Sequence, residues 1–300
     1  MTARQRLGAA GRLQEGAPLA PLTTYRFGGP ARFLVEAHSE VELEAAAALA
    51  TEEGLEPFVL GRGSNVVVSD RGFDGVVIRL AGAFLDHRID DAGVAHAGGA
   101  VPLPVLARFA ARAGRTGLEF FVGIPGSVGG AVRMNAGCHG SDTAGWLLDA
   151  RIVSLGDGVA RQETPQSLGL SYRHSGLGDA DVVVSARFRT EPGSPADAEA
   201  RIREITRWRK ETQPGGTLNA GSVFKNPPGD AAGGVIDRAG LKGFRIGGVE
   251  VSRRHANFFV ADPGATAAEV YALVSEVRRR VFAEVGIDLE PELRFLGDFS

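Results

Sequence analysis

The sequence predicts a mixed fold in which α-helices and β-strands are interleaved along the chain. Apolar residues recur with a period near 3.6 in several long segments and crowd into short β-branched runs in others, which are the patterns of helices and strands. Glycine accounts for 42 of the 300 residues but falls in clusters between the apolar runs, without a fixed repeat. That placement marks loops between elements and excludes a collagen-like or low-complexity chain.

The individual elements follow from these patterns in chain order. Strands are expected at residues 31–37, 57–60, 65–68, 75–80, 94–97, 149–155 and 181–188. Helices are expected at 40–53, 103–113, 196–212 and 266–285. The stretch TEPGSPADAEA at 190–200 interrupts the pattern with proline, serine and acidic residues, so it is the best internal domain boundary. For residues 1–20 we expect a flexible N-terminal tail.

Composition and charge exclude several classes of protein. The chain is 44% hydrophobic and 23% charged, which is typical of a globular protein with one or more cores. Lys and Arg total 33 against 36 Asp and Glu, so the net charge of −3 gives no reason to expect nucleic acid as a partner. One cysteine, Cys138, fits a reducing compartment, and no apolar run reaches the ~18 residues of a membrane span. We therefore expect a cytoplasmic protein that does not insert into membranes.

The histidines give no indication of a metal site. They stand at positions 38, 87, 96, 139, 174 and 255. They form no H-E-x-x-H motif and no close pairing with the cysteine, so no metal is expected. His255 is interpreted as a packed or turn histidine, and Cys138 as a small packed residue.

Two glycine-rich loops are the first candidate binding site. They are LGRGSNVVVS at 60–69 and GIPGSVGGAVRMNAGCHG at 123–140. Glycine lets main-chain N–H groups approach an anion closely and form the concave nests that bind phosphate, although each loop could equally be a set of tight turns. Neither G-x-x-x-x-G-K-[ST] nor G-x-G-x-x-G occurs, which disfavours a P-loop kinase and a Rossmann dinucleotide-binding domain.

Ser222 lies in a second candidate segment, NAGSVFKNP at 219–227. The G-x-S-x-G elbow of a nucleophilic serine is absent. From these residues alone, the hydroxyl could be a turn residue, a phosphate ligand or a proton donor.

Seven segments that span about residues 22–299 occur in a specific order. They are TYRFGGPARFLVEA, LGRGSNVVVSD, GIPGSVGGAVRMNAG, LSYRHS, NAGSVFKNP, HANFFV and LEPELRFLGDF. Together they resemble the UDP-N-acetylenolpyruvoylglucosamine reductase family, also called MurB. The resemblance implies an α+β fold. An FAD-binding domain of the PCMH, or vanillyl-alcohol-oxidase, type would occupy residues 21–190. An α+β substrate-binding domain would occupy 191–300, and its last strand would return to the flavin site.

The resemblance also implies the cofactors. FAD would be bound non-covalently with its pyrophosphate on the two glycine-rich loops, and NADPH would be the reductant. The implied FAD-binding residues are Gly61, Gly63, Ser64, Asn65, Pro125, Gly126, Ser127, Gly129, Gly130, Asn135, Ala136 and Gly137.

The implied reaction is the reduction of UDP-N-acetylglucosamine enolpyruvate to UDP-N-acetylmuramate in peptidoglycan synthesis. Negative charge would develop beside the substrate carboxylate, so the site needs a cation, a second polar group and a proton source. Arg173, Glu292 and Ser222 match these three catalytic positions of the family, in that order. Without the resemblance, Ser222 could brace a turn, and the other two could be surface charges.

The substrate diphosphate needs ligands of its own. Lys225 and Asn226 follow Ser222 closely, and Arg207 or Lys210 on the charged helix could add positive field or simply be solvated. Between Arg173 and that helix there is no room for an inserted tyrosine-bearing loop, so the chain resembles the shorter type II subgroup. We expect a monomer. Two other functions stay open, an FAD-linked alcohol or hydroxy-acid oxidase of the same fold and a non-catalytic UDP-sugar sensor.

Overall fold

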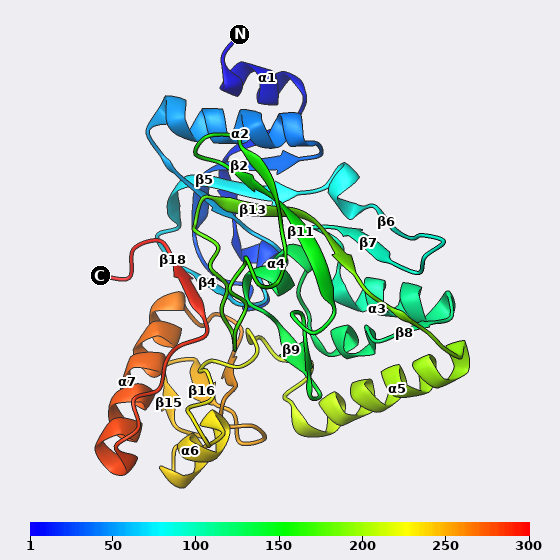
Figure 1. Ribbon diagram of the computed structural model, residues 1–300. Coiled ribbons are helices and arrows are strands. Elements are labelled where there is room, and N and C mark those ends of the chain that lie inside the picture. The colour runs from blue at the N-terminus through cyan, green and yellow to red at the C-terminus, as the bar shows by residue number, and fades with distance from the viewer. The chain divides into compact units, whose positions relative to one another are not determined.

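Helices and strands alternate from the first residues to the last in the computed structural model, which describes all 300 residues (Figure 1). The chain divides into two units, and each is described by itself. Unit 1 comprises residues 1–15, 33–62 and 75–208, and unit 2 comprises residues 16–32, 63–74 and 209–300. The division differs from a single boundary near residue 190, because unit 2 also takes two short segments from the first quarter of the chain.

The N-terminal segment has regular structure where a flexible tail was expected. It forms helix α1 (Ala3–Ala9) and strand β1 (Leu13–Pro18). Thr2 and Gln5 form a capping box at the start of α1, which satisfies two of the N–H groups that a helix leaves open. Ala3 and Leu7 are buried in a core shared with helix α2. These two contacts anchor a segment too short and too polar to show a periodic pattern.

The first sheet of unit 1 has the strand order β1-β2-β5-β3. Its other strands are β2 (Pro30–Ala37), β3 (Glu56–Val59) and β5 (Phe73–Leu80), and β3 runs parallel to β5. Helix α2 (Glu40–Glu53) lies beside this sheet, below α1 in Figure 1. It begins at the N-cap Ser39 and ends at Gly54, whose φ of 64° suits glycine. Apolar residues of α2 and the strands form one core.

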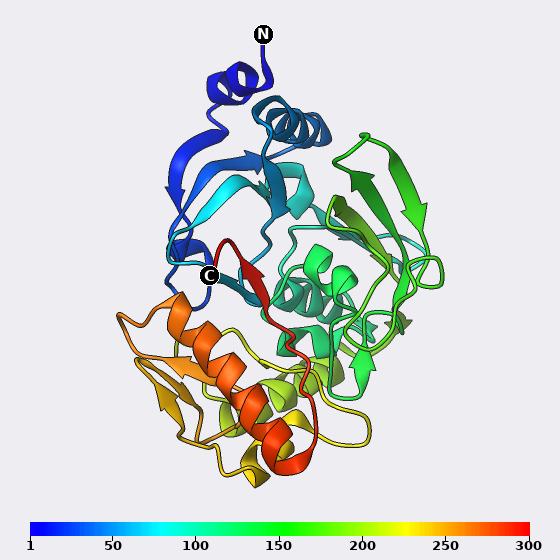
Figure 2. The same cartoon turned by 90° about the vertical axis from the view of Figure 1, so that its left-hand side faces the viewer.

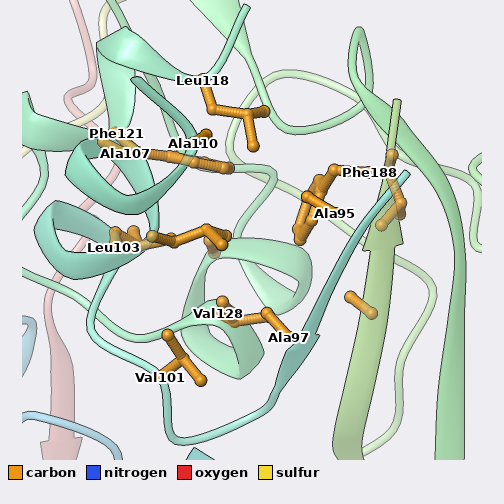
Figure 3. Close-up of a cluster of buried hydrophobic side chains, with 14 of the residues drawn as sticks. Ala95, Ala97, Val101, Leu103, Ala107, Ala110, Leu118, Phe121, Val128 and Phe188 are labelled. Atoms are coloured by element: carbon orange, nitrogen blue, oxygen red, sulfur yellow. The ribbon is translucent and has the colours of Figure 1, made fainter. Parts of the chain in front are cut away.

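The second sheet of unit 1 is fully antiparallel, with the order β12-β11-β13-β7-β6. The strands are β6 (His87–Ile89), β7 (Ala95–Gly98), β11 (Leu147–Ser154), β12 (Ala160–Glu163) and β13 (Asp181–Phe188). Helices α3 (Leu103–Arg112) and α4 (Val128–Arg133) pack with this sheet. Figure 3 shows Leu103, Val128 and Phe188 in the buried cluster between them. This packing fixes the second glycine-rich loop, because α4 is part of that loop.

Short elements complete unit 1. They are the 3-10 turns η2 (Gly82–Leu85) and η3 (Glu119–Gly123) and the two-residue strands β8 (Arg115–Thr116), β9 (Gly137–Cys138), β10 (Ser141–Asp142) and β14 (Glu191–Pro192). Helix α5 (Pro195–Thr212) follows, with most of its length in this unit. The stretch expected to be a domain boundary thus pairs as β14 with β8 and then starts a helix.

Unit 2 is built around helix α7 (Ala267–Val285) and the antiparallel sheet β15-β16-β17. The strands are β15 (Arg245–Ile246), β16 (Val249–Val251) and β17 (Phe259–Ala261), and Figure 2 shows them beside the orange α7. The 3-10 turn η1 (Ala20–Leu22) and helix α6 (Ala232–Arg238) belong to the same unit. Asp70 accepts hydrogen bonds from the N–H groups of Ala267 and Ala268, both at 2.9 Å, and so stabilises the start of α7.

The last strand pairs with a strand from the first quarter of the chain. Strand β18 (Arg294–Leu296) runs parallel to β4 (Val66–Val68), which directly follows the first glycine-rich loop. The hydroxyl of Tyr25 donates to the carbonyl of Phe259 at 3.0 Å, and burial raises the pKa of this tyrosine. Unit 2 therefore gathers residues 16–32, 63–74 and the C-terminal third around one core.

Candidate active site

The second glycine-rich loop is held against the segment that precedes α3. The N–H of Leu103 donates to the carbonyl of Gly126 at 3.0 Å, and the N–H of Gly129 donates to Gly99 at 2.8 Å. A Cβ added at Gly129 would stand 3.1 Å from the carbonyl oxygen of Gly99 and 3.2 Å from that of Val183. Glycine suits position 129 because a Cβ there would press against the backbones of two other segments.

The two glycine-rich loops meet at Gly61 and Ser127. A Cβ at Gly61 would lie 3.0 Å from the Ser127 hydroxyl oxygen, so a larger residue there would have to displace this hydroxyl. Ser127 is 5% exposed and occupies the N-cap of α4, yet its hydroxyl makes no helix-capping bond. The N–H groups of Val128 and Gly129 at the start of α4 already donate to the carbonyls of Val101 and Gly99. The Ser127 hydroxyl, which faces Gly61 with no side chain between them, is the group here that fits a donor to an FAD pyrophosphate.

The other predicted residues of the first loop lie in unit 2. Gly63 has a φ of 61°, and a Cβ there would collide with the carbonyl of Leu22. Asn65 donates from its side-chain nitrogen to the carbonyl of Glu292 at 2.9 Å, and its own carbonyl accepts from the N–H of Arg294 at 3.0 Å. Asn65 therefore connects the first glycine-rich loop to the predicted catalytic glutamate.

Arg173 sits in a two-residue turn of unit 1. Ser171 and His174 exchange backbone hydrogen bonds of 3.1 Å in both directions, and Tyr172 and Arg173 form the turn between them. Arg173 has a φ of 53°, a conformation that residues other than glycine rarely adopt. One terminal nitrogen of its guanidinium donates to the carbonyl of Gly137 at 3.0 Å. The structure thus brings Arg173 to the second glycine-rich loop.

Ser222 lies in an extended segment of unit 2, between two other segments. On one side Ser222 pairs with Phe258, and the N–H of Val223 donates to the carbonyl of Asn257 at 2.9 Å. On the other side the N–H of Glu292 donates to the carbonyl of Val223 at 2.8 Å. The backbone of this segment is thus hydrogen-bonded on both edges.

Ser222 and Glu292 are therefore adjacent in space although they are far apart in the chain. Both side chains are partly exposed, whereas the neighbouring Val223 and Phe224 are 0% and 1% exposed. Glu292 is likewise followed by the buried Leu293, so each of the two predicted catalytic residues lies beside a core residue that anchors its segment. Arg173 belongs to unit 1, whereas Ser222 and Glu292 belong to unit 2.

Comparison with known proteins identifies the chain. A family model for an FAD binding domain matches residues 31–162, and one for the C-terminal domain of UDP-N-acetylenolpyruvoylglucosamine reductase matches residues 213–296. The UDP-N-acetylenolpyruvoylglucosamine reductase of Rubrobacter xylanophilus is 46% identical over 296 residues, covering 98% of each chain. The chain belongs to the UDP-N-acetylenolpyruvoylglucosamine reductase family. The reductase of Heliobacterium modesticaldum is 43% identical over 290 residues, covering 96% of this chain and 92% of its own.

Solved structures of similar fold agree with this membership. The crystal structure of MurB from Thermus caldophilus has a TM-score of 0.82 and 38% identity, covering 95% of this chain and 99% of that one. BBE-like 1 of Physcomitrella patens has a TM-score of 0.50 at 17% identity over 64% of this chain and 45% of its own, a likeness of fold alone. The α+β fold with an FAD-binding domain and a MurB C-terminal domain is confirmed.

The residues predicted to bind the diphosphate of a MurB substrate have varied surroundings. Lys225, whose side chain is 20% exposed, forms an ion pair of 2.7 Å with Glu290. The side-chain oxygen of Asn226 accepts from the N–H of Ala232 at 3.0 Å, at the first residue of α6. Arg207 and Lys210 are exposed on α5. Lys225 and Asn226 therefore have structural partners in addition to the binding role predicted for them.

Asn257 is a residue that the sequence did not single out. It is 3% exposed, its side-chain oxygen accepts from the N–H of Phe224 at 2.9 Å, and its side-chain nitrogen donates to the carbonyl of Phe224 at 2.8 Å. The side-chain amide of Asn257 thus bonds to the backbone N–H and C=O of Phe224 in the way that a residue on a neighbouring strand would. A polar residue inside HANFFV, a motif of the MurB resemblance, is the only sign of this in the sequence.

Three further observations concern a hollow, metal ligands and membrane-spanning helices. A hollow of about 180 Å³ between α2 and the turn from β11 to β12 is lined by none of the predicted residues. No group of three His, Cys, Asp or Glu side chains is arranged to hold a metal ion. None of the helices combines the length and the apolar character needed to cross a bilayer.

Proposed function

We propose that this chain reduces UDP-N-acetylglucosamine enolpyruvate to UDP-N-acetylmuramate, with NADPH as the reductant. The observation that carries the proposal is the bonding of Glu292 to both the Ser222 segment and Asn65 of the first glycine-rich loop. This arrangement occurs in a chain that is 46% identical to a UDP-N-acetylenolpyruvoylglucosamine reductase over 98% of its length. The protein would act as a cytoplasmic monomer with non-covalent FAD.

When bound, FAD supplies the hydride that NADPH has given up, and this hydride adds to the terminal carbon of the enolpyruvyl double bond. The guanidinium of Arg173 binds the substrate carboxylate and offsets the negative charge that spreads from it toward the neighbouring carbon. The carboxyl group of Glu292 holds the same charge-bearing group from a second direction. One hydride and one proton are added in all, and NADP⁺ is released.

Ser222 donates the proton to the carbon next to the carboxylate. An alcohol is a weak acid, but a carbanion-like centre is basic enough to accept its proton when the geometry is fixed. The hydrogen bonds on both edges of the segment supply that fixed geometry. Water then restores the proton to the hydroxyl.

The proposal places the chain in the shorter, type II subgroup. Between Arg173 and α5 the chain contains only β13 and the two-residue β14, and the tyrosines of the whole chain stand at 25, 172 and 271. Lys225, Asn226, Arg207 and Lys210 would then supply the contacts to the substrate diphosphate.

Ser222→Ala tests the role of the hydroxyl by separating the two half-reactions. The variant should fold, bind FAD and bleach on addition of NADPH at the wild-type rate, because neither step uses the hydroxyl. Reoxidation by the enolpyruvyl nucleotide, followed by stopped-flow absorbance, should slow by about 10²-fold or more, the scale of a lost general acid. Reoxidation at the wild-type rate would refute the assignment. Bleaching of the wild-type protein by an alcohol but not by NADPH would indicate an oxidase instead.

A further inference from the structure

The turn that carries Arg173 needs support from outside itself. It contains only two residues between the paired Ser171 and His174, and Arg173 adopts a left-handed φ of 53°. Tyr172 is 53% exposed, so the turn has little apolar burial of its own. An isolated two-stranded hairpin is marginal in water, and a left-handed arginine weakens it further.

Asn135 supplies that support from the second glycine-rich loop. It is 3% exposed, and its side-chain nitrogen donates to the carbonyl of Ser171 at 3.0 Å and to the carboxylate of Asp142 at 3.2 Å. Its side-chain oxygen accepts from the N–H of Ala144 at 2.8 Å. One amide therefore joins the base of the Arg173 turn to the chain around β10, with both of its N–H donors in use.

Two further bonds place the turn on the same loop. The hydroxyl of Ser175 donates to the carbonyl of Arg133 at 2.7 Å, and the Arg173 guanidinium donates to the carbonyl of Gly137 at 3.0 Å. Alternate residues 133, 135 and 137 thus bond to residues 175, 171 and 173. Asn135 is the only one of these three loop residues that uses its side chain, so on the loop side its bond alone depends on the residue type.

Asparagine is suited to this position for two reasons. Asn135 has a φ of 40°, and asparagine is among the few residues that tolerate the left-handed region. It also offers two donors and an acceptor on a short side chain, whereas aspartate offers acceptors only. Aspartate at 135 would turn a carboxylate toward both the Ser171 carbonyl and the Asp142 carboxylate.

We propose that Asn135 is a positioning residue for the reaction, which fixes the guanidinium of Arg173 by holding the turn at Ser171. This inference rests on the function proposed for Arg173. The sequence suggested FAD as the partner of Asn135, whereas in the structure both N–H donors of its side chain bond to the protein.

Asn135→Gly removes the side-chain amide, while glycine still accepts the left-handed backbone conformation of position 135. The variant therefore tests the loss of the bond to Ser171 without adding backbone strain. NADPH should reduce the bound FAD at the wild-type rate, since Arg173 is not needed for that step. Reoxidation by the enolpyruvyl nucleotide should slow by about 10- to 100-fold, the cost of a displaced reacting group. Asn135→Asp should slow it at least as much. Thr143→Val is the matched control, because Thr143 is fully buried and bonds to Ala136 of the same loop without touching the turn.

Two measurements separate positioning from a general loss of structure. In an Arg173→Ala background, Asn135→Gly should cause little further slowing, because the group that it positions is gone. Hydrogen exchange of residues 171–175 should be faster in Asn135→Gly and unchanged in Thr143→Val, a comparison that involves no activity.

The outcomes distinguish the inference from the function beneath it. If Arg173→Ala reoxidises at the wild-type rate, the role proposed for Arg173 fails, and the positioning role fails with it. If Arg173→Ala is slow but Asn135→Gly is not, only the inference on Asn135 is overturned. That inference is likewise overturned if Asn135→Gly slows reoxidation equally in both backgrounds, or if it impairs FAD reduction as much as reoxidation.

Discussion

The predicted catalytic residues are held in two different ways in the two units. In unit 2, Ser222 and Glu292 lie on extended segments joined by backbone hydrogen bonds, such as the 2.8 Å bond from Glu292 to Val223. In unit 1, Arg173 lies on a two-residue turn that depends on the side chains of Asn135 and Ser175. Backbone bonds survive a change of side chain, whereas side-chain bonds do not.

This difference determines where the chain tolerates substitution. Ser222 and Glu292 lie on segments whose backbone pairing does not involve their side chains, so a substitution at either position leaves that pairing in place. Arg173 is placed by residues that have no chemistry of their own. Substitutions outside the catalytic set should therefore impair the Arg173 region more selectively than the Ser222 region.

Glu292→Gln should have the largest effect among the substitutions that test the paired segments of Ser222 and Glu292 in unit 2. Reoxidation by the enolpyruvyl nucleotide should slow by about 10²- to 10³-fold, the usual cost of removing one group that stabilises a transition-state charge. The free energy of unfolding should change by no more than about 1 kcal/mol, since the N–H of residue 292 keeps its bond to Val223 and its carbonyl keeps the bond from the Asn65 side chain. Rapid kinetics and urea unfolding of the same samples measure the two quantities. A large loss of stability would contradict the idea that the Glu292 side chain takes no part in holding this region.

Asn257→Ala should give the next largest effect, on stability. It leaves the N–H and C=O of the buried Phe224 without the partners that they have now, which should lower the free energy of unfolding by about 3 kcal/mol. Ser175→Ala in unit 1 removes one hydroxyl donor and should cost about 1 kcal/mol. Urea unfolding compares the two variants. Equal costs would mean that the two hydrogen bonds of the Asn257 side chain contribute no more to stability than the single hydrogen bond of the Ser175 hydroxyl.

The sequence predicted the long elements because each carries its own local signals. Helix α7 begins with a capping box of Thr266 and Glu269 and ends at Gly286 with a φ of 70°. The expected span 266–285 therefore agrees with Ala267–Val285 to one residue. Helix α1 escaped prediction because it spans only Ala3–Ala9 and buries two residues, too few to show a period.

The site was predictable as a set of residue types but not as a set of bonds. The motifs pointed to Ser222 and Glu292, and the structure places their segments side by side. Asn65 and Asn135 were assigned to FAD, yet their amides hold backbone groups 227 and 36 positions away in the chain. An amide bonds equally well to a ligand or to a carbonyl, and only the folded chain decides which one is within reach.

Protonation of His255 at low pH should have the mildest effect on the region around Ser222. Its ring lies 4.8 Å from that of Phe258, the residue that pairs with Ser222. Burial lowers the pKa of His255 below its ordinary 6.5, and the positive charge of Lys242 lowers this pKa further. In the unfolded chain the imidazole takes up a proton near its ordinary pKa, whereas the folded protein resists protonation until a lower pH. The contribution of His255 to stability is therefore complete above pH 6.5 and declines as the pH falls below that value.

His255→Gln should remove this part of the pH dependence. Glutamine cannot titrate, and its side-chain oxygen can replace the ring nitrogen that accepts from the N–H of Asn257 at 3.3 Å. Urea midpoints measured from about pH 7.5 down to about pH 5 should fall less steeply in the variant than in the wild-type protein. Well above pH 6.5 the change in midpoint should not depend on pH, because the imidazole is neutral in both states there. Equal slopes in the acid range would show that the proton taken up on unfolding belongs to another group.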